Sequence, residues 1–195
     1  MDLKQKIVEA VSGSICEVLK ATFSLSASIK KIENRDKTNG EEIVASIGLS
    51  GPLSASLVLV LPVKSALWVV SKMIGDEIKE VTQDVVDGTG ELVNMIAGCL
   101  KKHLEGSFSC ALGLPAVIVG ADPLSIAKLC RTENLSLDVQ SQEVSFQVYF
   151  SYAIPEPGMD QQDAAGEGIP ESSGKEVADV LRNFLKNKNN NKGNS

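Results

Sequence analysis

The sequence lacks the residues from which most metal sites and many hydrolytic enzymes are built. Among 195 residues there is a single histidine, His103, and no two of the four cysteines have C-x-x-C spacing. A tetrahedral zinc site needs clustered thiolates or imidazoles, so the sequence predicts no metal site. Serine-hydrolase and cysteine-protease mechanisms need a histidine base and would depend on His103 alone. We interpret His103 as a surface or half-buried helix residue.

Basic charge and long apolar runs are also scarce. The 19 lysines and arginines are outnumbered by 25 acidic residues, which gives a formal net charge of −6. Affinity for nucleic acid comes mostly from basic side chains that neutralise phosphates, so no nucleic-acid partner is expected. The most apolar stretches, Leu57–Leu61 and Ala66–Val70, are far shorter than the ~20 residues of a membrane-spanning helix, so no membrane insertion is expected.

The composition is typical of one globular domain with a tail. Hydrophobic residues make up 43% of the chain and charged residues 23%, which suffices for a core of useful size. The first residues lead into an amphipathic pattern and not into an apolar signal region. No disulfide framework is expected, and we predict reduced thiols in a cytoplasmic protein at Cys16, Cys99, Cys110 and Cys130.

Hydrophobic periodicity predicts a mixture of helices and strands. Apolar residues recur at intervals of three and four over about residues 2–22, 63–74 and 78–104, where we expect helices. An extended segment is expected at 23–33. Turn residues separate further runs that are expected to form strands, at 43–49, 53–61, 108–112, 114–120, 125–131, 135–140 and 144–153.

Residues 155–195 differ in composition from the rest. Gly, Pro, Asp, Glu and Ser are enriched over Pro155–Ser173, which is typical of a linker. A short amphipathic helix is expected after it, with an apolar face formed by Val177, Val180, Leu181, Phe184 and Leu185. The Lys/Asn-rich end is expected to fray. The sequence therefore predicts a domain over residues 1–154 and a tail over 155–195.

A faint internal repeat relates the two halves of the predicted domain. A shift of 85 residues aligns Gly13 with Gly98 and Phe23 with Phe108, so that each half has a long helix followed by strands. A chance match is the alternative. The repeat predicts a pseudo-symmetric α+β fold in which two similar units share a sheet.

One face of the predicted helix 78–104 is polar. At 3.6 residues per turn, a single stripe contains Asp87, Glu91, Asn94, Gly98, Lys101 and Glu105. Such a stripe is most often a solvated helix surface. Three glycines lie near it, at residues 88, 90 and 98, and each costs up to ~1 kcal/mol of helix stability relative to alanine. Because glycines let another backbone approach closely, the stripe is a candidate docking surface.

The segment that contains this stripe resembles the signature helix of the CheC/CheX/FliY phosphatases of bacterial chemotaxis, with the pattern Glu91-Leu92-x-Asn94-Met95-Ile96-x-Gly98. Other passages are similar to family segments in the same order: Leu61-Pro62-x-x-x-Ala66-Leu67, then Met73-x-Gly75, and Pro115-x-Val117-x-x-Gly120. The resemblance covers about residues 1–153. It implies a pseudo-symmetric CheC/CheX-like α+β fold, with long helices packed on a largely antiparallel sheet.

The resemblance also implies how many Glu–Asn sites the chain has and how many chains assemble. Under the 85-residue shift, Lys6 and Glu9 stand where Glu91 and Asn94 stand in the second half. The first helix therefore lacks the pair, which leaves one site, as in the CheX-like branch. The family resemblance implies a homodimer. We expect the stretch 125–153 to offer sheet edges that could pair across a two-fold axis.

The function implied by the resemblance is hydrolysis of the aspartyl phosphate of a CheY-like response regulator. Such a regulator carries its own Mg²⁺ and lysine, so this chain is expected to need no cofactor. Asn94 is expected to orient the attacking water, because an amide both donates and accepts hydrogen bonds. Glu91 is expected to pair with a cation of the regulator.

The same stripe is expected to contact the partner through Asp87, Gly98 and Lys101. The alternative is a non-catalytic module that keeps the fold and docks a response regulator or other signalling protein without hydrolysis. Presence of both Glu91 and Asn94 favours the enzyme.

Overall fold

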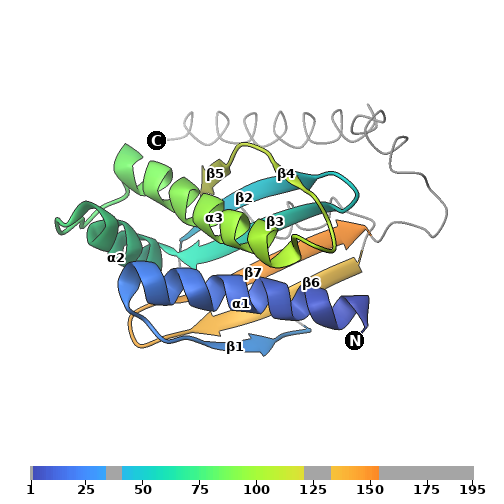
Figure 1. The fold of residues 1–195 in the computed structure, drawn as a ribbon. Coiled ribbons are helices and arrows are strands. Elements are labelled where there is room, and N and C mark those ends of the chain that lie inside the picture. Colours follow the sequence, from blue (N-terminus) through green and yellow to red (C-terminus); the bar gives the residue numbers. More distant parts are fainter. Residues whose placement is uncertain (1, 34–40, 121–132, 154–195) are drawn as a thin grey trace. The chain divides into compact units, whose positions relative to one another are not determined.

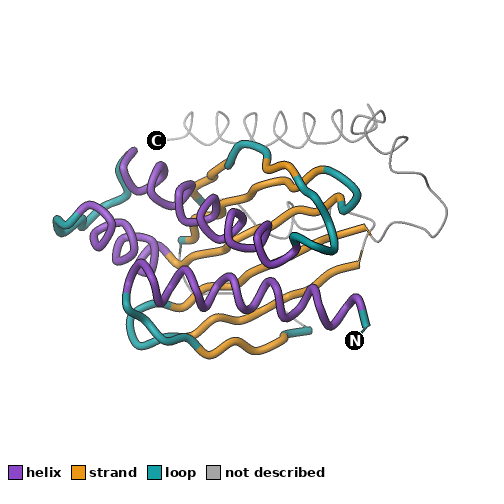
Figure 2. The backbone as a smooth tube through the Cα atoms, in the orientation of Figure 1, coloured by secondary structure: helices purple, strands orange, loops and turns teal. Residues whose placement is uncertain are grey.

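The computed structural model describes residues 2–33, 41–120 and 133–153 of the chain (Figures 1 and 2). The predicted strand at 125–131 and the predicted tail at 155–195 lie outside the described residues. Within those residues, no helix is long and apolar enough to cross a membrane.

Three helices lie on one face of an antiparallel sheet, as Figure 1 shows. The helices are α1 (Leu3–Phe23), α2 (Val63–Ile74) and α3 (Gln83–Leu104). The strands are β1 (Ser28–Lys31), β2 (Glu42–Ser50), β3 (Ser54–Pro62), β4 (Ala111–Leu112), β5 (Ala116–Val119), β6 (Glu133–Gln140) and β7 (Ser145–Ala153). The predicted α+β class, with long helices on a largely antiparallel sheet, is confirmed.

The core forms between the helices and the sheet because side chains alternate across each strand. On β3, Leu57, Leu59 and Leu61 are fully buried in the cluster that includes the helices. The intervening Val58 and Val60 belong to a small separate cluster on the other face. This period of two is what places one apolar face of the hairpin β2–β3 under α3.

The order of the strands relates the two halves of the domain. The sheet runs β1-β6-β7-β3-β2-β4, and β5 also pairs with β2. The strands β7 and β3 form the central pair, flanked by their hairpin partners β6 and β2. Beyond each hairpin lies a short strand from the other half: β1 on β6, and β4 and β5 on β2. This exchange agrees with the pseudo-symmetry that the 85-residue repeat predicts.

The bounds of α2 agree with the prediction, whereas α3 begins later than predicted. Gly75 ends α2 with a left-handed backbone (φ +89°) and donates its N–H to the Ser71 carbonyl at 2.9 Å. The N–H of Ile78 donates to Ser71 Oγ at 2.9 Å, which ties this residue to the end of α2. Ile78 and Val81 pack on the core from a loop. Because their three-residue spacing is also that of a buried helix face, the sequence predicted a helix that begins before Gln83.

The expectation of free sheet edges in residues 125–153 is wrong for β7 and for the part of β6 from Leu137 to Gln140, which have strand partners on both sides. β6 pairs with both β1 and β7, and β7 pairs with both β6 and β3. Among the described strands, the outermost positions belong to β1 on one side and to β4 and β5 on the other. A local reading of strand propensity cannot reveal this, because strand order is set by which segments meet in space.

Gly88 allows α2 and α3 to pack closely, and its substitution is expected to destabilise the fold. A Cβ at residue 88 would lie 2.8 Å from both γ carbons of Val70, which is fully buried. We expect Gly88→Ala to lower the free energy of unfolding by up to about 2 kcal/mol, since overpacking costs ~1–3 kcal/mol and the gain in helix propensity returns ~1 kcal/mol. Urea denaturation would measure the difference.

Gly98→Ala is the matched control for this prediction. Nothing lies within 4 Å of a Cβ at residue 98 of the same helix, so alanine is expected to raise the free energy of unfolding by up to ~1 kcal/mol. Equal stabilisation by both substitutions would contradict the close packing at Gly88.

Candidate functional site

Glu91 and Asn94 lie one turn apart on the outer side of α3. Glu91 is exposed and Asn94 is half-buried. The Nδ2 of Asn94 donates to Glu91 Oε2 at 3.4 Å, so the carboxylate and the amide form a single polar group. The opposite side of the same turns is fixed in the core by Leu92, Val93 and Ile96, all fully buried. The backbone under the pair is therefore held by packing while the two side chains face outward.

The predicted polar stripe is present on α3 but ends before Glu105. Asp87 is exposed, whereas Gly98 and Lys101 are half-buried, and all three lie within the helix with Glu91 and Asn94. Asp87 accepts a hydrogen bond from Gln83 Nε2 at 2.8 Å. The helix ends at Leu104, and Glu105 has an extended ψ of 135°. Glu105 therefore does not continue the stripe.

Of the three glycines near the stripe, two serve internal packing. Gly88 meets Val70 of α2, and Gly90 is buried with Val117 Cγ2 3.4 Å from the position of a Cβ. Gly98 alone of the three faces open space. The interpretation of these glycines as a docking surface is therefore wrong for Gly88 and Gly90 and stays a prediction for Gly98. Spacing alone cannot distinguish a glycine that faces solvent from one against a neighbouring element.

The turn before β5 borders the same part of α3 and carries a residue that sequence reasoning missed. Leu114 is 91% exposed and precedes the exposed Pro115. The ring of Pro115 lies 3.9 Å from the position of a Cβ at Gly90, next to Glu91 in the chain. The apolar run from Leu114 predicted a strand, but β5 begins only at Ala116. Leu114 is thus left in solvent, one residue before the proline that contacts the position of a Cβ at Gly90.

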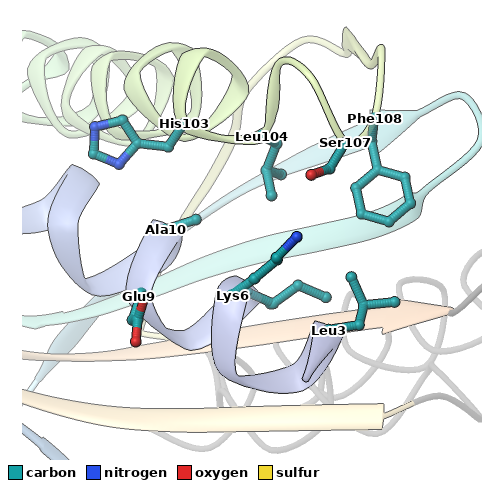
Figure 3. Close-up of a pocket in the computed structure, with 9 residues that line it drawn as sticks. Leu3, Lys6, Glu9, Ala10, His103, Leu104, Ser107 and Phe108 are labelled. Carbon is teal, nitrogen blue, oxygen red and sulfur yellow. The ribbon is translucent and has the colours of Figure 1, made fainter. Parts of the chain in front are cut away.

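A cleft lies at the place where the internal repeat would put a second Glu–Asn pair. It has a volume of about 420 Å³ between the start of α1 and the end of α3, and its lining includes Lys6, Glu9, His103 and Phe108 (Figure 3). Lys6 and Glu9 are the counterparts of Glu91 and Asn94 under the 85-residue shift. The wall of this cleft contains no Glu–Asn pair, as the sequence indicates.

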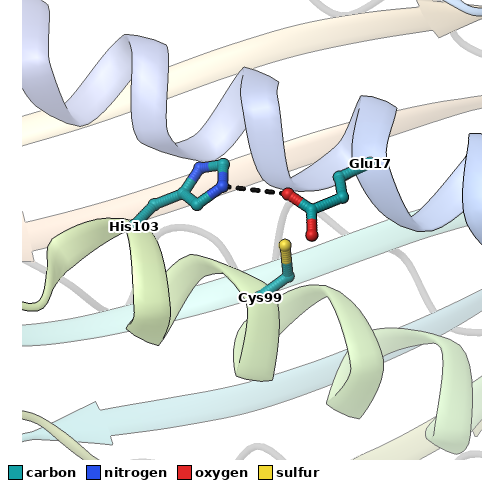
Figure 4. A group of neighbouring side chains, drawn as sticks. All are labelled: Glu17, Cys99 and His103. Carbon is teal, nitrogen blue, oxygen red and sulfur yellow. Dashed lines mark hydrogen bonds and ion pairs between the residues drawn. The ribbon is translucent and has the colours of Figure 1, made fainter.

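His103 lies at the packed boundary of α1 and α3, with 33% of its side chain exposed, in agreement with its interpretation as a surface or half-buried helix residue (Figure 4). Its Nε2 is 3.1 Å from Glu17 Oε2. The hydrogen bond to His103 lowers the pKa of the Glu17 carboxyl. Cys99, one turn before His103, is 8% exposed, and burial raises the pKa of its thiol. These three groups are separate from the polar stripe.

Known proteins share both the sequence pattern and the fold. The family described as chemotaxis phosphatase CheX matches residues 43–151. The CheY-P phosphatase CheX of Thermotoga maritima is 28% identical over 140 residues, which cover 71% of this chain and 90% of that protein.

Two solved structures have the same fold at low identity. A CheC-like superfamily protein from Shewanella sp. PV-4 superimposes with a TM-score of 0.65 at 20% identity, over 78% of this chain and 99% of that one. A chain of the CheX–CheY–BeF₃–Mg²⁺ complex from Borrelia burgdorferi superimposes with a TM-score of 0.62 at 20% identity, over 78% and 98%. Since the family match spans more than half of the sequence and includes all of α3, the chain belongs to the CheX family of chemotaxis phosphatases.

Proposed function

We propose that this protein hydrolyses the aspartyl phosphate of a CheY-like response regulator, with Glu91 and Asn94 as its site. The observation that carries the proposal is the outward-facing pair of a carboxylate and an amide on a helix held rigidly from behind. The Thermotoga relative is named for this activity, and the Borrelia structure is a complex of CheX with CheY. Both favour a phosphorylated regulator as the partner.

In the proposed reaction, the main task of this chain is to hold the attacking water molecule in position. The water oxygen attacks phosphorus in line with the bond to the regulator's aspartate, that bond breaks, and inorganic phosphate and the free carboxylate result. A Mg²⁺ ion held by the regulator would balance the charge on the phosphoryl oxygens, so no cofactor of this chain is proposed. Holding the water in the reactive geometry supplies the remaining rate enhancement.

Asn94 has the chemistry to hold this water. One N–H of its amide is directed to Glu91 Oε2, which orients the group and leaves Oδ1 to accept a proton of the water. In this arrangement Glu91 has two roles: it positions the amide and presents a negative charge to the partner. A cationic side chain of the regulator next to its phosphorylation site would pair with that charge.

The other stripe residues would set the register of docking. Acidic Asp87 and Glu91 lie towards the start of α3, whereas basic Lys101 lies near its end. A partner with the opposite order of charges would be guided to one orientation. Gly98, which faces open space between these ends, would let the partner's backbone approach the helix.

The decisive measurement is release of inorganic phosphate from a phosphorylated CheY-like regulator in excess Mg²⁺. A catalytic role predicts that substoichiometric amounts of this chain accelerate release above the regulator's own rate, in proportion to the chain's concentration. Binding without acceleration would favour the non-catalytic docking module. Neither binding nor acceleration would contradict both functions.

We also propose that the protein is a homodimer. Among the described strands, β1 and β5 each pair on one side alone, and outer strands with unpaired backbone groups are the usual sites of sheet extension. Light scattering at micromolar concentration is expected to give about twice the chain mass of 20.7 kDa. A mass near that of one chain would contradict the dimer.

A further inference from the structure

Three potential metal ligands from two helices converge in the packed boundary of α1 and α3 (Figure 4). Glu17 extends from α1, and Cys99 and His103 extend from successive turns of α3. One carboxylate oxygen, one sulfur and one ring nitrogen all lie within 4.8 Å of one another. The thiol is at the buried side of the group, and the Glu17 side chain, 58% exposed, is at its open side.

The imidazole of His103 is held in one orientation by α1. A Cβ at Gly13 would lie 3.1 Å from Cε1 and 3.2 Å from Nδ1 of the ring, so the missing side chain at residue 13 makes room for it. Ser14 Oγ lies 3.4 Å from Nδ1. The ring therefore directs its other nitrogen, Nε2, towards Glu17.

The contacts around the ring suit a histidine that binds a metal ion through Nε2. The hydroxyl of Ser14 donates to the Ala10 carbonyl at 2.6 Å, which leaves its oxygen free to accept from Nδ1 of His103 in the tautomer that carries a proton there. In the neutral tautomer with its proton on Nδ1, the lone pair of Nε2 is directed at Glu17 Oε2, 3.1 Å away, which is the form of histidine that binds a metal ion through Nε2. A proton on Nε2 would make an ordinary hydrogen bond to Glu17 here, whereas a metal ion in its place would bind the nitrogen and the carboxylate oxygen together. The nearby Cys99 sulfur supplies a third donor that a proton would not use.

We propose that Glu17, Cys99 and His103 bind one Zn²⁺ ion. Nitrogen, sulfur and carboxylate oxygen are the donors that zinc takes in proteins, and bonds of ~2.0–2.3 Å place tetrahedral ligand atoms ~3.3–3.7 Å apart. The observed separations need only small side-chain adjustments to reach this geometry. The carboxylate and the thiolate would neutralise the ion, and the thiol proton would be released to solvent on binding.

Two further features suit a zinc site with an open position. Ser14 would accept the Nδ1–H of the metal-bound imidazole, the contact that ordinarily orients such a ligand. Three protein ligands and a solvent-facing side leave the fourth position to water. The ion would join α1, in the first half of the domain, to α3, in the second half.

The test uses the full chain, stripped of metal with a chelator and titrated with Co²⁺ as a spectroscopic substitute for Zn²⁺. We expect one equivalent of Co²⁺ to bind, with a thiolate-to-cobalt charge-transfer band in the near ultraviolet that Zn²⁺ removes by competition. Addition of Zn²⁺ to the stripped protein is expected to raise Tm by several degrees.

Substitutions assign the ligands. Cys99→Ser is expected to abolish the charge-transfer band, whereas Cys16→Ser, at a half-buried thiol next to Glu17 in the chain, is expected to keep it. Glu17→Gln and His103→Gln are expected to weaken binding by at least about 10-fold, and Ser14→Ala by about 10-fold. Glu9→Gln, an exposed carboxylate on the same helix, is the matched control for Glu17→Gln.

The proposal is overturned by several results. They are the absence of stoichiometric binding to the wild type, a Tm that Zn²⁺ does not change, or a charge-transfer band that persists in Cys99→Ser. Far-ultraviolet circular dichroism without metal would establish that each variant is folded. Should Cys99→Ser fail to fold, Glu17→Gln decides the question, because its exposed side chain can change without disturbing the core.

Discussion

Asn94→Ala is expected to lower the rate of phosphate release by about 10²–10³-fold, because it removes a preorganised polar group from the transition state. The fold is expected to stay intact. The side chain faces outward, its hydrogen bond to Glu91 is long at 3.4 Å, and alanine is the better helix former. The free energy of unfolding should therefore remain level or rise slightly. Loss of activity without loss of stability would separate a catalytic role from a structural one.

The measurement is steady-state phosphate release from a phosphorylated CheY-like regulator in excess Mg²⁺. The chain contains a matched control on α1, where Gln5 Nε2 donates to Glu9 Oε1 at 2.9 Å. Gln5→Ala removes an exposed amide from a similar amide–carboxylate pair outside the proposed site and is expected to keep wild-type turnover. An Asn94→Ala protein with undiminished turnover would falsify the role proposed for this residue.

Glu91→Ala is expected to lower kcat/KM by about 10–100-fold, through weaker binding of the regulator as well as slower turnover. Removal of one member of an intermolecular charge pair weakens association, and the loss is larger where the pair is desolvated. The substitution also removes the acceptor that orients the Asn94 amide. Both KM and kcat should change, whereas Asn94→Ala should change mainly kcat.

Glu91→Gln separates the two roles of this carboxylate. Glutamine keeps an oxygen that can accept from Asn94 but carries no charge, so we expect it to restore much of kcat and little of the affinity. The salt dependence of KM should fall in the same variant, because exposed charge pairs are screened by salt. Glu9→Ala is the control. Regulator binding that is unchanged in Glu91→Ala would contradict the proposed ion pair.

Local patterns were sufficient for α1 and α2 and for the placement of Glu91 and Asn94 on α3, although not for the start of α3. The three-residue spacing of Glu91 and Asn94 places both on one side of any helix. The apolar residues of that helix recur every three or four positions, and this spacing identifies the side that is buried. The end of α2 followed from Gly75, since a glycine readily takes the left-handed backbone of a helix end. Each of these features depends on residues within one or two turns of each other.

Contacts between distant segments decided the rest. Gly88 and Gly90 pack inward because Val70 and Val117 happen to face them, and β6 is an interior strand because β1 comes from the other half of the domain. Glu17 meets His103 across 86 residues of sequence, so the absence of C-x-x-C spacing was no guide to which donor atoms converge. By itself the sequence determined which residues share a face. Only the tertiary structure decided what each face meets, because packing and strand order depend on pairs of segments that no local period describes.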